Sequence, residues 1–216
     1  MIFATGNKGK IREAREILGI DIQSPADLGI FDDPEETGLT FQENSLIKAK
    51  AIFDRTGLDC FADDSGLEVD ALGGAPGIYS ARFMALDLEK WPPLKGVDVL
   101  KQGIPDHNFD ANIERLLDEL SKRPDAPRTA RFRCVTTLML NGVPHYFEGT
   151  CEGRIAYEKA GCGGFGYDPV FIPDKGQGAG EAKTIAELGE EVKNSISHRG
   201  EALRRMAKFL QASSQI

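Results

Sequence analysis

The alternation of apolar and polar positions predicts a chain of strand and helix units. The opening run MIFA is apolar and predicts a short strand, which the loop TGNKGK follows. Apolar residues between Ile11 and Leu18 then recur at helical spacing, and Gly19 supplies a stop. A second helix is predicted over TFQENSLIKAKAIFDRTG, where Thr40 and Glu43 have the spacing of a capping box. The first sixty residues therefore favour a strand, a loop and two helices.

The rest of the chain continues this mixture and adds a hairpin. CFADD and LEVD are interpreted as two short strands around a tight Ser65-Gly66 connection. NFDANIERLLDELSK and SHRGEALRRMAKFLQ have helical spacing, and PVFIP predicts a further strand. Two β-rich runs flank Asn141-Gly142, which is a strong hairpin signal. Together these patterns predict an α/β fold with a mixed β-sheet flanked by helices.

One segment does not fit this regular alternation. Residues 83–108 contain the single tryptophan and several prolines, and they predict no regular element. We interpret them as an insertion that forms a lid, a dimer contact or an inert surface excursion, and we favour a surface or dimer role. Since the chain has 216 residues, we expect one domain, residues 1–216, that carries this insertion.

Composition and charge restrict the class of partner. The net charge of −8 argues against a general nucleic-acid-binding surface, which needs a dense positive field. No apolar run approaches the length of a membrane helix, so no membrane partner is expected. The four cysteines form no CxxC pair, and no secretory leader precedes them. We therefore expect reduced, packing cysteines and a cytoplasmic protein.

The loop TGNKGK has features of a phosphate-binding loop. It follows a strand and begins a helix, so backbone N–H groups, the positive helix end and the ammonium groups of Lys8 and Lys10 can converge on phosphate. The spacing is not that of a Walker A loop. A glycine turn with two solvated lysines explains the same residues equally well.

Three carboxylates suggest a metal site with hydrolytic chemistry. Asp63 and Asp64 are expected at a strand end, and Glu43 lies at the start of the second helix. Carboxylates that meet near phosphates suit Mg²⁺, and one of them can activate a water for attack on phosphorus. Each has a structural alternative, because Glu43 can close the capping box and Asp-Asp is a common turn sequence.

Two later motifs suggest recognition of a base and of an anion. GGFGYDP places Phe165, Tyr167 and Asp168 in a glycine-rich loop, where an aromatic ring can stack on a nucleobase. A core aromatic between turn glycines is the alternative. KNSISHRG brings Lys193, His198 and Arg199 to the start of the last helix, where they suit an anion or a carbonyl acceptor.

Five motifs together resemble one known family. TGNKGK, TFQENS, FADDSGLEVDALGGAPGIYSAR, GGFGYDPVF and KNSISHRGEAL occur in the order seen in the inosine triphosphate pyrophosphatases, also called dITP/XTP diphosphatases, and resemble the bacterial branch most. They span residues 5–203, and only the insertion at 83–108 departs from the compact pattern.

The resemblance implies an activity, a cofactor and a set of site residues. It implies Mg²⁺-dependent hydrolysis of ITP, dITP and XTP to the monophosphate and pyrophosphate, by a homodimeric α/β protein with two lobes around a central nucleotide cleft. Asp64 would be the general base and, with Glu43, a metal ligand. The residues that would bind substrate are Thr5, Gly6, Asn7, Lys8, Gly9, Lys10, Ser65, Phe165, Gly166, Tyr167, Asp168, Lys193, His198 and Arg199.

Base chemistry gives this substrate class a physical reason. Hypoxanthine and xanthine present an acceptor oxygen at position 6, which donors from His198 or Arg199 would match, whereas adenine presents an amino donor. A buried hydrogen bond of this kind can discriminate by about 10⁴ or more. Two alternatives stay open: a pyrimidine triphosphate pyrophosphatase like the Maf-like proteins, and a noncatalytic purine nucleotide sensor.

Overall fold

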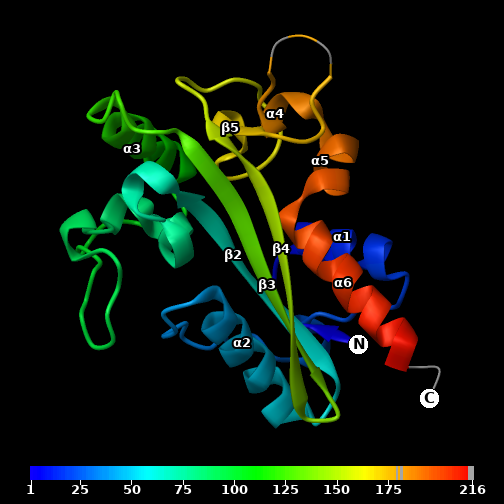
Figure 1. Cartoon of the computed structure of the whole chain (residues 1–216). Helices are drawn as coiled ribbons and strands as arrows, with labels where there is room; N and C mark the ends of the chain where they lie inside the picture. Colours follow the sequence, from blue (N-terminus) through cyan, green and yellow to red (C-terminus); the bar gives the residue numbers. More distant parts are fainter. Residues whose placement is uncertain (179, 181, 214–216) are drawn as a thin grey trace. The chain divides into compact units, whose positions relative to one another are not determined.

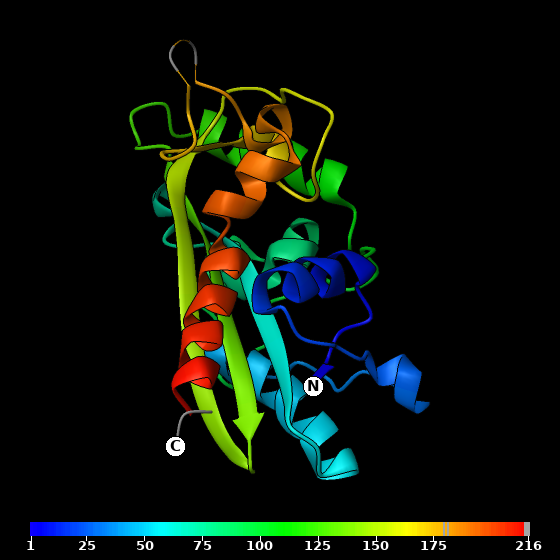
Figure 2. The same ribbon diagram turned by 90° about the vertical axis from the view of Figure 1, so that its right-hand side faces the viewer.

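The computed structural model describes residues 1–178, 180 and 182–213. These residues contain a mixed five-stranded sheet, whose long strands are visible in Figures 1 and 2. The strand order is β1-β2-β3-β4-β5; β1 pairs parallel with β2, and β4 pairs antiparallel with β5. The strands are β1 (Ile2–Phe3), β2 (Cys60–Val69), β3 (Thr129–Leu140), β4 (Val143–Ile155) and β5 (Phe171–Pro173). The predicted α/β class with a mixed sheet is confirmed.

In the described part of the chain, six α-helices accompany the sheet, and α1 and α2 end at the glycines where the sequence predicts a stop. They are α1 (Lys8–Leu18), α2 (Phe41–Thr56), α3 (Phe109–Ser121), α4 (Ile185–Leu188), α5 (Glu190–Ile196) and α6 (His198–Ser213). Gly19 and Gly57 end α1 and α2 in the left-handed conformation, with φ of 64° and 67°. Among the described helices, none is both long enough and apolar enough to cross a membrane.

One predicted connection is wrong. CFADD and LEVD form a single strand, β2, so Asp63, Asp64 and Ser65 lie inside a strand and not at its end. Nearly all of β2 is buried, which removes the alternation that marks a half-exposed strand. Gly66 is required for close packing and not for a turn, since an added Cβ would lie 2.2 Å from the carbonyl oxygen of Gly77.

The predicted hairpin at Asn141-Gly142 is confirmed. Both residues have positive φ, 50° and 78°, as a two-residue hairpin turn between β3 and β4 requires. A hydrogen bond from the backbone N–H of Asn141 to the Asp59 carboxylate, at 2.8 Å, connects the turn to the residue that precedes β2.

The chain folds into two compact units. Unit 1 contains Met1–Ser65, Cys134–Thr150 and the segment from Ser197 onward, and unit 2 contains Gly66–Arg133 and Cys151–Ile196. In unit 1, strand side chains alternate between two apolar clusters, as Phe61 packs with α1 and α6 whereas Cys60 and Ala62 pack with α2. Helices α1 and α6 lie side by side in both views of the chain (Figures 1 and 2).

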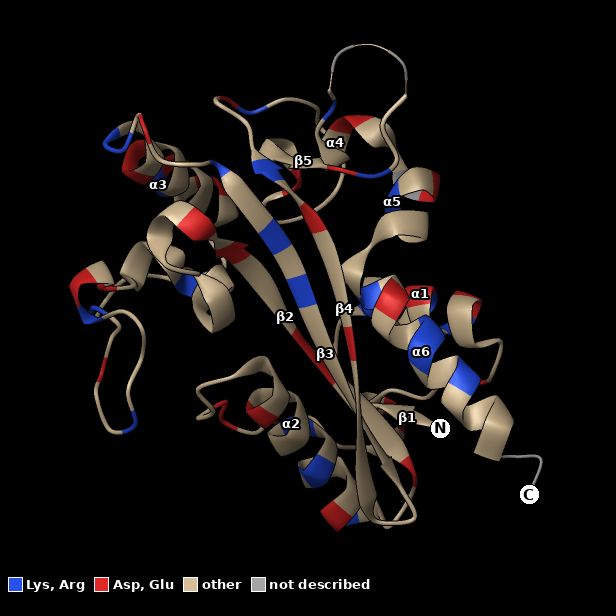
Figure 3. Cartoon of the chain, in the orientation of Figure 1, with Lys and Arg blue, Asp and Glu red and all other residues tan. Residues whose placement is uncertain are grey.

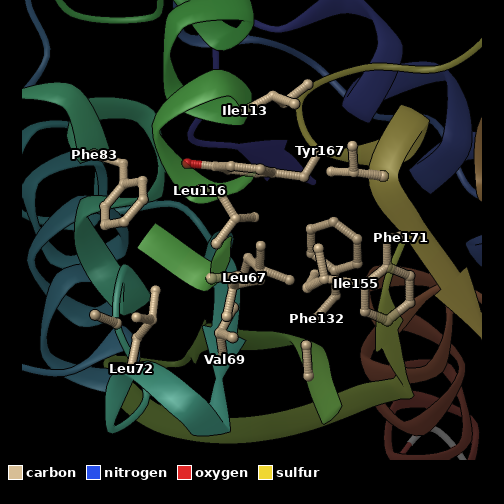
Figure 4. Packing of buried hydrophobic residues seen from close by; sticks show 14 of the residues in the cluster. Leu67, Val69, Leu72, Phe83, Ile113, Leu116, Phe132, Ile155, Tyr167 and Phe171 are labelled. Atoms are coloured by element: carbon tan, nitrogen blue, oxygen red, sulfur yellow. The ribbon is translucent and has the colours of Figure 1, made fainter. Parts of the chain in front are cut away.

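The core of unit 2 joins the sheet to α3. Leu67, Phe132, Ile155 and Phe171 come from four strands and pack with α3 residues such as Leu116 (Figure 4). Tyr167 of the glycine-rich loop and Val170, which directly precedes β5, belong to the same cluster.

The insertion at 83–108 is partly integrated into this core. Leu86 and Val99 are buried, and an isolated antiparallel bridge joins Leu86 to Leu100. The indole N–H of Trp91 donates to the carbonyl of Gly73 at 2.9 Å. The segment is therefore not an inert surface excursion.

Candidate active site

The predicted phosphate-binding loop begins α1 in unit 1. The Asn7 side chain caps the helix by accepting from the backbone N–H groups of Gly9 and Lys10, at 2.9 and 3.1 Å. Gly6 and Lys8 are exposed, and an added Cβ on Gly6 would meet open space. Asn7 thus occupies two of the donors expected to face phosphate, while Thr5 accepts from the N–H of Asn7 at 3.2 Å.

Asp63 is the centre of a buried ionic network in unit 1. Its two oxygens accept from Lys10 Nζ and Arg199 Nε, both at 2.8 Å, and Arg199 also pairs with Glu13 at 3.1 Å. Burial alone would raise the pKa of Asp63, but the cations outweigh it and hold that pKa well below the usual range. Because both carboxylate oxygens of Asp63 accept hydrogen bonds from cationic side chains, Asp63 positions Lys10 and Arg199. Ser65 lies beside this network, with its hydroxyl 3.5 Å from Arg199.

Asp64 points to different partners from its neighbour. Lys48 Nζ lies 3.3 Å from Oδ1, and the Asn44 side-chain amide donates to Oδ2 at 3.2 Å. Burial raises the pKa of Asp64 to about 6, although the charge of Lys48 opposes the rise. A carboxylate with a pKa near neutrality is suited to accept a proton at physiological pH. Asp63 and Asp64 are adjacent in β2, and Figure 3 shows acidic positions along this strand.

The two glutamates near α2 have different roles. Oε2 of Glu43 accepts from the N–H groups of Leu39 and Thr40, at 2.6 and 3.2 Å, so Glu43 closes the capping box. Glu36, which the sequence reasoning missed, pairs with Lys48 at 2.7 Å, and its charge raises the pKa of Asp64. In the sequence, only proximity to the motif TFQENS could have indicated that Glu36, Asn44 and Lys48 belong to this site.

The carboxylates of Asp64, Glu36 and Glu43 are the candidate ligands for a hard divalent cation. No cluster of three or more His, Cys, Asp or Glu side chains with metal-binding geometry occurs among the described residues. Mg²⁺ usually needs only one or two carboxylates, because waters and phosphate oxygens supply its other ligands. The carboxylate oxygens of Asp64 and Glu36 are ligands of the kind that Mg²⁺ prefers. One carboxylate oxygen of Glu43 already accepts two hydrogen bonds in the helix cap.

The glycine-rich loop in unit 2 is organised by Asp168. This buried carboxylate accepts from the Phe165 N–H at 2.7 Å and from Lys193 Nζ at 2.5 Å. An added Cβ on Gly164 would lie 2.2 Å from Oδ2 of Asp168, so glycine is required there. Lys193, which lies in α5, is therefore joined to this loop by a direct ion pair.

The two aromatic side chains of the loop behave differently. Tyr167 is 2% exposed, and its hydroxyl donates to the Ser80 carbonyl at 2.8 Å. Its ring lies beside Ile113 and Leu116 (Figure 4), as the core alternative describes. Phe165 is 63% exposed, and its ring forms an edge-to-face pair with Phe109, with centroids 4.6 Å apart. Of the two rings, Phe165 is the one with a face available for a base.

A pocket of about 390 Å³ opens beside Phe165 in unit 2. Its walls come from the end of the insertion, the start of α3 and the glycine-rich loop. The lining residues are His107, Asn108, Phe109, Asp110, Ile113, Cys162, Gly163, Gly164, Phe165, Gly166 and Pro169. Cys162 is exposed there, so the packing role predicted for all four cysteines holds only for the three buried ones.

The predicted nucleoside-binding residues belong to both units. Phe165–Asp168 and Lys193 lie in unit 2, whereas His198 and Arg199 lie at the start of α6 in unit 1. Arg199 is held by Asp63 and Glu13, a pairing that the sequence pattern does not predict.

Known proteins are similar to this chain over nearly its whole length. A family model described as the Ham1 family matches residues 1–209. The chain is 42% identical to a dITP/XTP pyrophosphatase of Christiangramia forsetii, over 97% of this chain and 98% of the relative. It is 43% identical to a protein of the same name in Escherichia coli K12, over 97% of each.

Solved structures give the same result. A HAM1 protein from Coxiella burnetii matches with a TM-score of 0.80 at 36% identity, and covers 98% of both chains. The Ham1 protein of Staphylococcus aureus matches with a TM-score of 0.80 at 37% identity over the same share. Sequence and structure together show that this chain belongs to the Ham1 family.

Proposed function

We propose that this protein hydrolyses non-canonical purine nucleoside triphosphates, such as dITP, ITP and XTP, to the monophosphate and pyrophosphate. The names of its relatives support this activity. The single structural observation that carries it is Asp64, a buried carboxylate with a pKa raised to about 6 and with a separate donor on each oxygen. Pure nucleotide binding has little need for such a group, which argues against a sensor.

In this proposal, Asp64 accepts a proton from the water that attacks the α-phosphorus. Its pKa leaves it ionised above about pH 6, where it can act as a base. Lys10 and Lys48 supply positive charge for the phosphates, and pyrophosphate leaves as the water adds.

We propose Mg²⁺ as the cofactor. Asp64 and Glu36 are the residues best suited to hold it, and Glu43 stays a predicted ligand through its remaining oxygen. When bound, the cation would neutralise phosphate charge and lower the pKa of a coordinated water.

In unit 2, we propose that Phe165 stacks on the base and that the loop held by Asp168 and Lys193 fixes its position. His198 and Arg199 stay predicted donors for the 6-oxygen of a purine, as the family resemblance implies. Arg199 must then exchange part of its pairing with Asp63 for the base.

A cytoplasmic homodimer is the proposed state. The family resemblance supports it, as do exposed apolar side chains such as Phe31 and Leu94. Leu94 belongs to the insertion, for which the sequence favours a surface or dimer role. Sedimentation at micromolar concentration tests the dimer, and a monomer there would contradict it.

The activity is tested by pyrophosphate release from ITP, XTP, GTP, ATP, dUTP and TTP in parallel, with and without Mg²⁺. We expect strong turnover of ITP and XTP only, and its loss in Asp64→Asn by about 10²–10⁴-fold, as for removal of a general base. Preference for dUTP or TTP would favour the pyrimidine alternative. Near-native turnover by folded Asp64→Asn would contradict the role of Asp64.

A further inference from the structure

Helix α2 presents two side chains to one carboxylate. Asn44 and Lys48 are four residues apart and so lie on the same face of the helix. Asn44 Nδ2 donates to Oδ2 of Asp64 at 3.2 Å, and Lys48 Nζ lies 3.3 Å from Oδ1. Because each oxygen has its own donor from a rigid helix, rotation of the carboxylate group is restricted.

The other end of the Asn44 amide binds the segment that leads into α2. Oδ1 of Asn44 accepts from the backbone N–H of Gly38 at 2.8 Å, and Asn44 is only 2% exposed. A backbone N–H can only donate, so the oxygen of the amide faces Gly38 and the NH₂ group faces Asp64. The orientation of this amide is therefore determined by its two partners.

The same segment carries Glu36. Since Glu36 pairs with Lys48 at 2.7 Å, Asn44 and Lys48 both connect this segment to Asp64. Gly38 is closely packed here, because an added Cβ would lie 2.6 Å from Oδ1 of Asn44. Asn44 thus links the candidate base to the segment that holds a second carboxylate.

We propose that Asn44 is a positioning residue for the hydrolysis. It holds the carboxylate of Asp64 in the rotation needed to accept a proton from the attacking water, and it acts through Asp64 without touching the substrate. This inference rests on the proposed function, since it assigns a role in that reaction.

A variant of the neighbouring residue Ser45 can distinguish a positioning role of Asn44 from a general packing role. Ser45 is fully buried on the same helix and lies 2.6 Å from the hydroxyl of Thr137, so it connects α2 to β3. It has no hydrogen bond to Asp64 among those found in the described residues. Ser45→Ala is therefore a matched control for the loss of a buried polar contact on α2.

The test compares kcat, KM and melting temperature for Asn44→Ala, Asn44→Asp and Ser45→Ala, with ITP and saturating Mg²⁺. Asn44→Asp keeps an acceptor for the Gly38 N–H but replaces the donor to Asp64 by a second carboxylate, so it also adds a negative charge beside Asp64, whereas Asn44→Ala removes the donor without adding charge. We expect both Asn44 variants to lower kcat by about 10–100-fold with little change in KM, because small misplacement of a reacting group has effects of that size. Ser45→Ala should lower the melting temperature and keep kcat.

A double mutant shows whether Asn44 acts through Asp64. In an Asp64→Asn background, Asn44→Ala should lower the residual rate no further, since residues that act as a unit are not additive. An equal fall in both backgrounds, or full kcat in folded Asn44→Ala, would overturn this inference alone. No pyrophosphate release by the wild-type protein would overturn it together with the proposed function.

Discussion

At the scale of single residues, adjacent positions on β2 have opposite electrostatic environments. Asp63 faces Lys10 and Arg199 and has a lowered pKa, whereas burial raises that of Asp64. In a strand, successive side chains point to opposite faces, so neighbours in sequence meet different partners. Asp63 therefore binds the neighbouring cationic side chains, whereas Asp64 is suited to accept a proton.

Lys48 opposes the raised pKa of Asp64, so its removal should change the pH profile. Lys48→Met should raise that pKa above about 6 by about one unit, since a close cation favours the charged form. Because the base must be ionised, the acidic limb of kcat/KM should move to higher pH, as measured from pH 5 to 9. The control is Lys50→Met, which removes an exposed lysine paired with Asp54. An unmoved acidic limb in Lys48→Met would contradict the prediction.

The choice between the two glutamates is tested by their Mg²⁺ requirement. Glu36→Gln should raise the Mg²⁺ concentration for half-maximal rate by about tenfold or more, because affinity depends on the charge of the ligands. Glu43→Gln should change it little, since glutamine can also close a capping box. A larger effect at Glu43 would return the ligand role to that residue.

Phe165 has an exposed face and should contribute to binding. Phe165→Ala should raise KM for ITP by about 5–100-fold with a smaller effect on kcat, since stacking contributes about 1–3 kcal/mol per base. Tyr157→Ala, which removes an exposed aromatic elsewhere in unit 2, is the control. If KM stays unchanged in Phe165→Ala, the ring does not stack on the base.

At the scale of elements, β2 continues through a glycine that sequence patterns assign to a turn. The Leu67 N–H donates to the Ser80 hydroxyl at 2.8 Å, so the 3₁₀ segment Gly77–Ala85 packs directly on the strand. This contact is close enough that only a residue without a side chain fits at position 66.

Substitution of this glycine should destabilise the protein. Gly66→Ala should reduce the free energy of unfolding by about 1–3 kcal/mol or more, as overpacking of a tight site does. Gly178→Ala, where an added Cβ meets no atom within 4 Å, should be nearly neutral. Urea unfolding measures both, and equal stabilities would show that the 3₁₀ segment moves to accommodate the methyl group.

At the scale of the whole molecule, the Asp63 network makes stability depend on pH. The pKa of Asp63 in the folded protein lies below its value of about 3.9 in the unfolded chain. The stabilisation that Asp63 contributes is therefore complete above about pH 3.9 and is lost as the pH falls through the folded pKa. Asp63→Asn should lower the free energy of unfolding by about 3–5 kcal/mol at pH 7, because it removes the carboxylate that pairs with both Lys10 and Arg199 and leaves Arg199 with Glu13.

Urea unfolding between pH 3 and 8 tests this prediction, with Asp32→Asn as the control, because Asp32 and Arg55 form an exposed pair. The difference between the wild-type protein and Asp63→Asn should become smaller below pH 4. A difference that stays constant over this range would show that Asp63 acts by packing and not by charge.

Local patterns along the sequence were sufficient for much of the fold. The caps of α1 and α2, the amphipathic face of α3 and the Asn141-Gly142 turn depend on residues a few positions apart, so each was predictable. The order of the five motifs also predicted the family, which the comparisons confirm.

Only the tertiary structure decided which groups meet. The pairing of Asp63 with Arg199, of Asp64 with Asn44, and of Lys193 with Asp168 joins residues 20 or more positions apart. The interior position of Asp63 and Asp64 in β2 and the burial of Tyr167 followed from the same packing. Sequence periodicity records which face of an element is apolar, but it does not record which polar groups from distant elements share that face; this is decided when the elements pack.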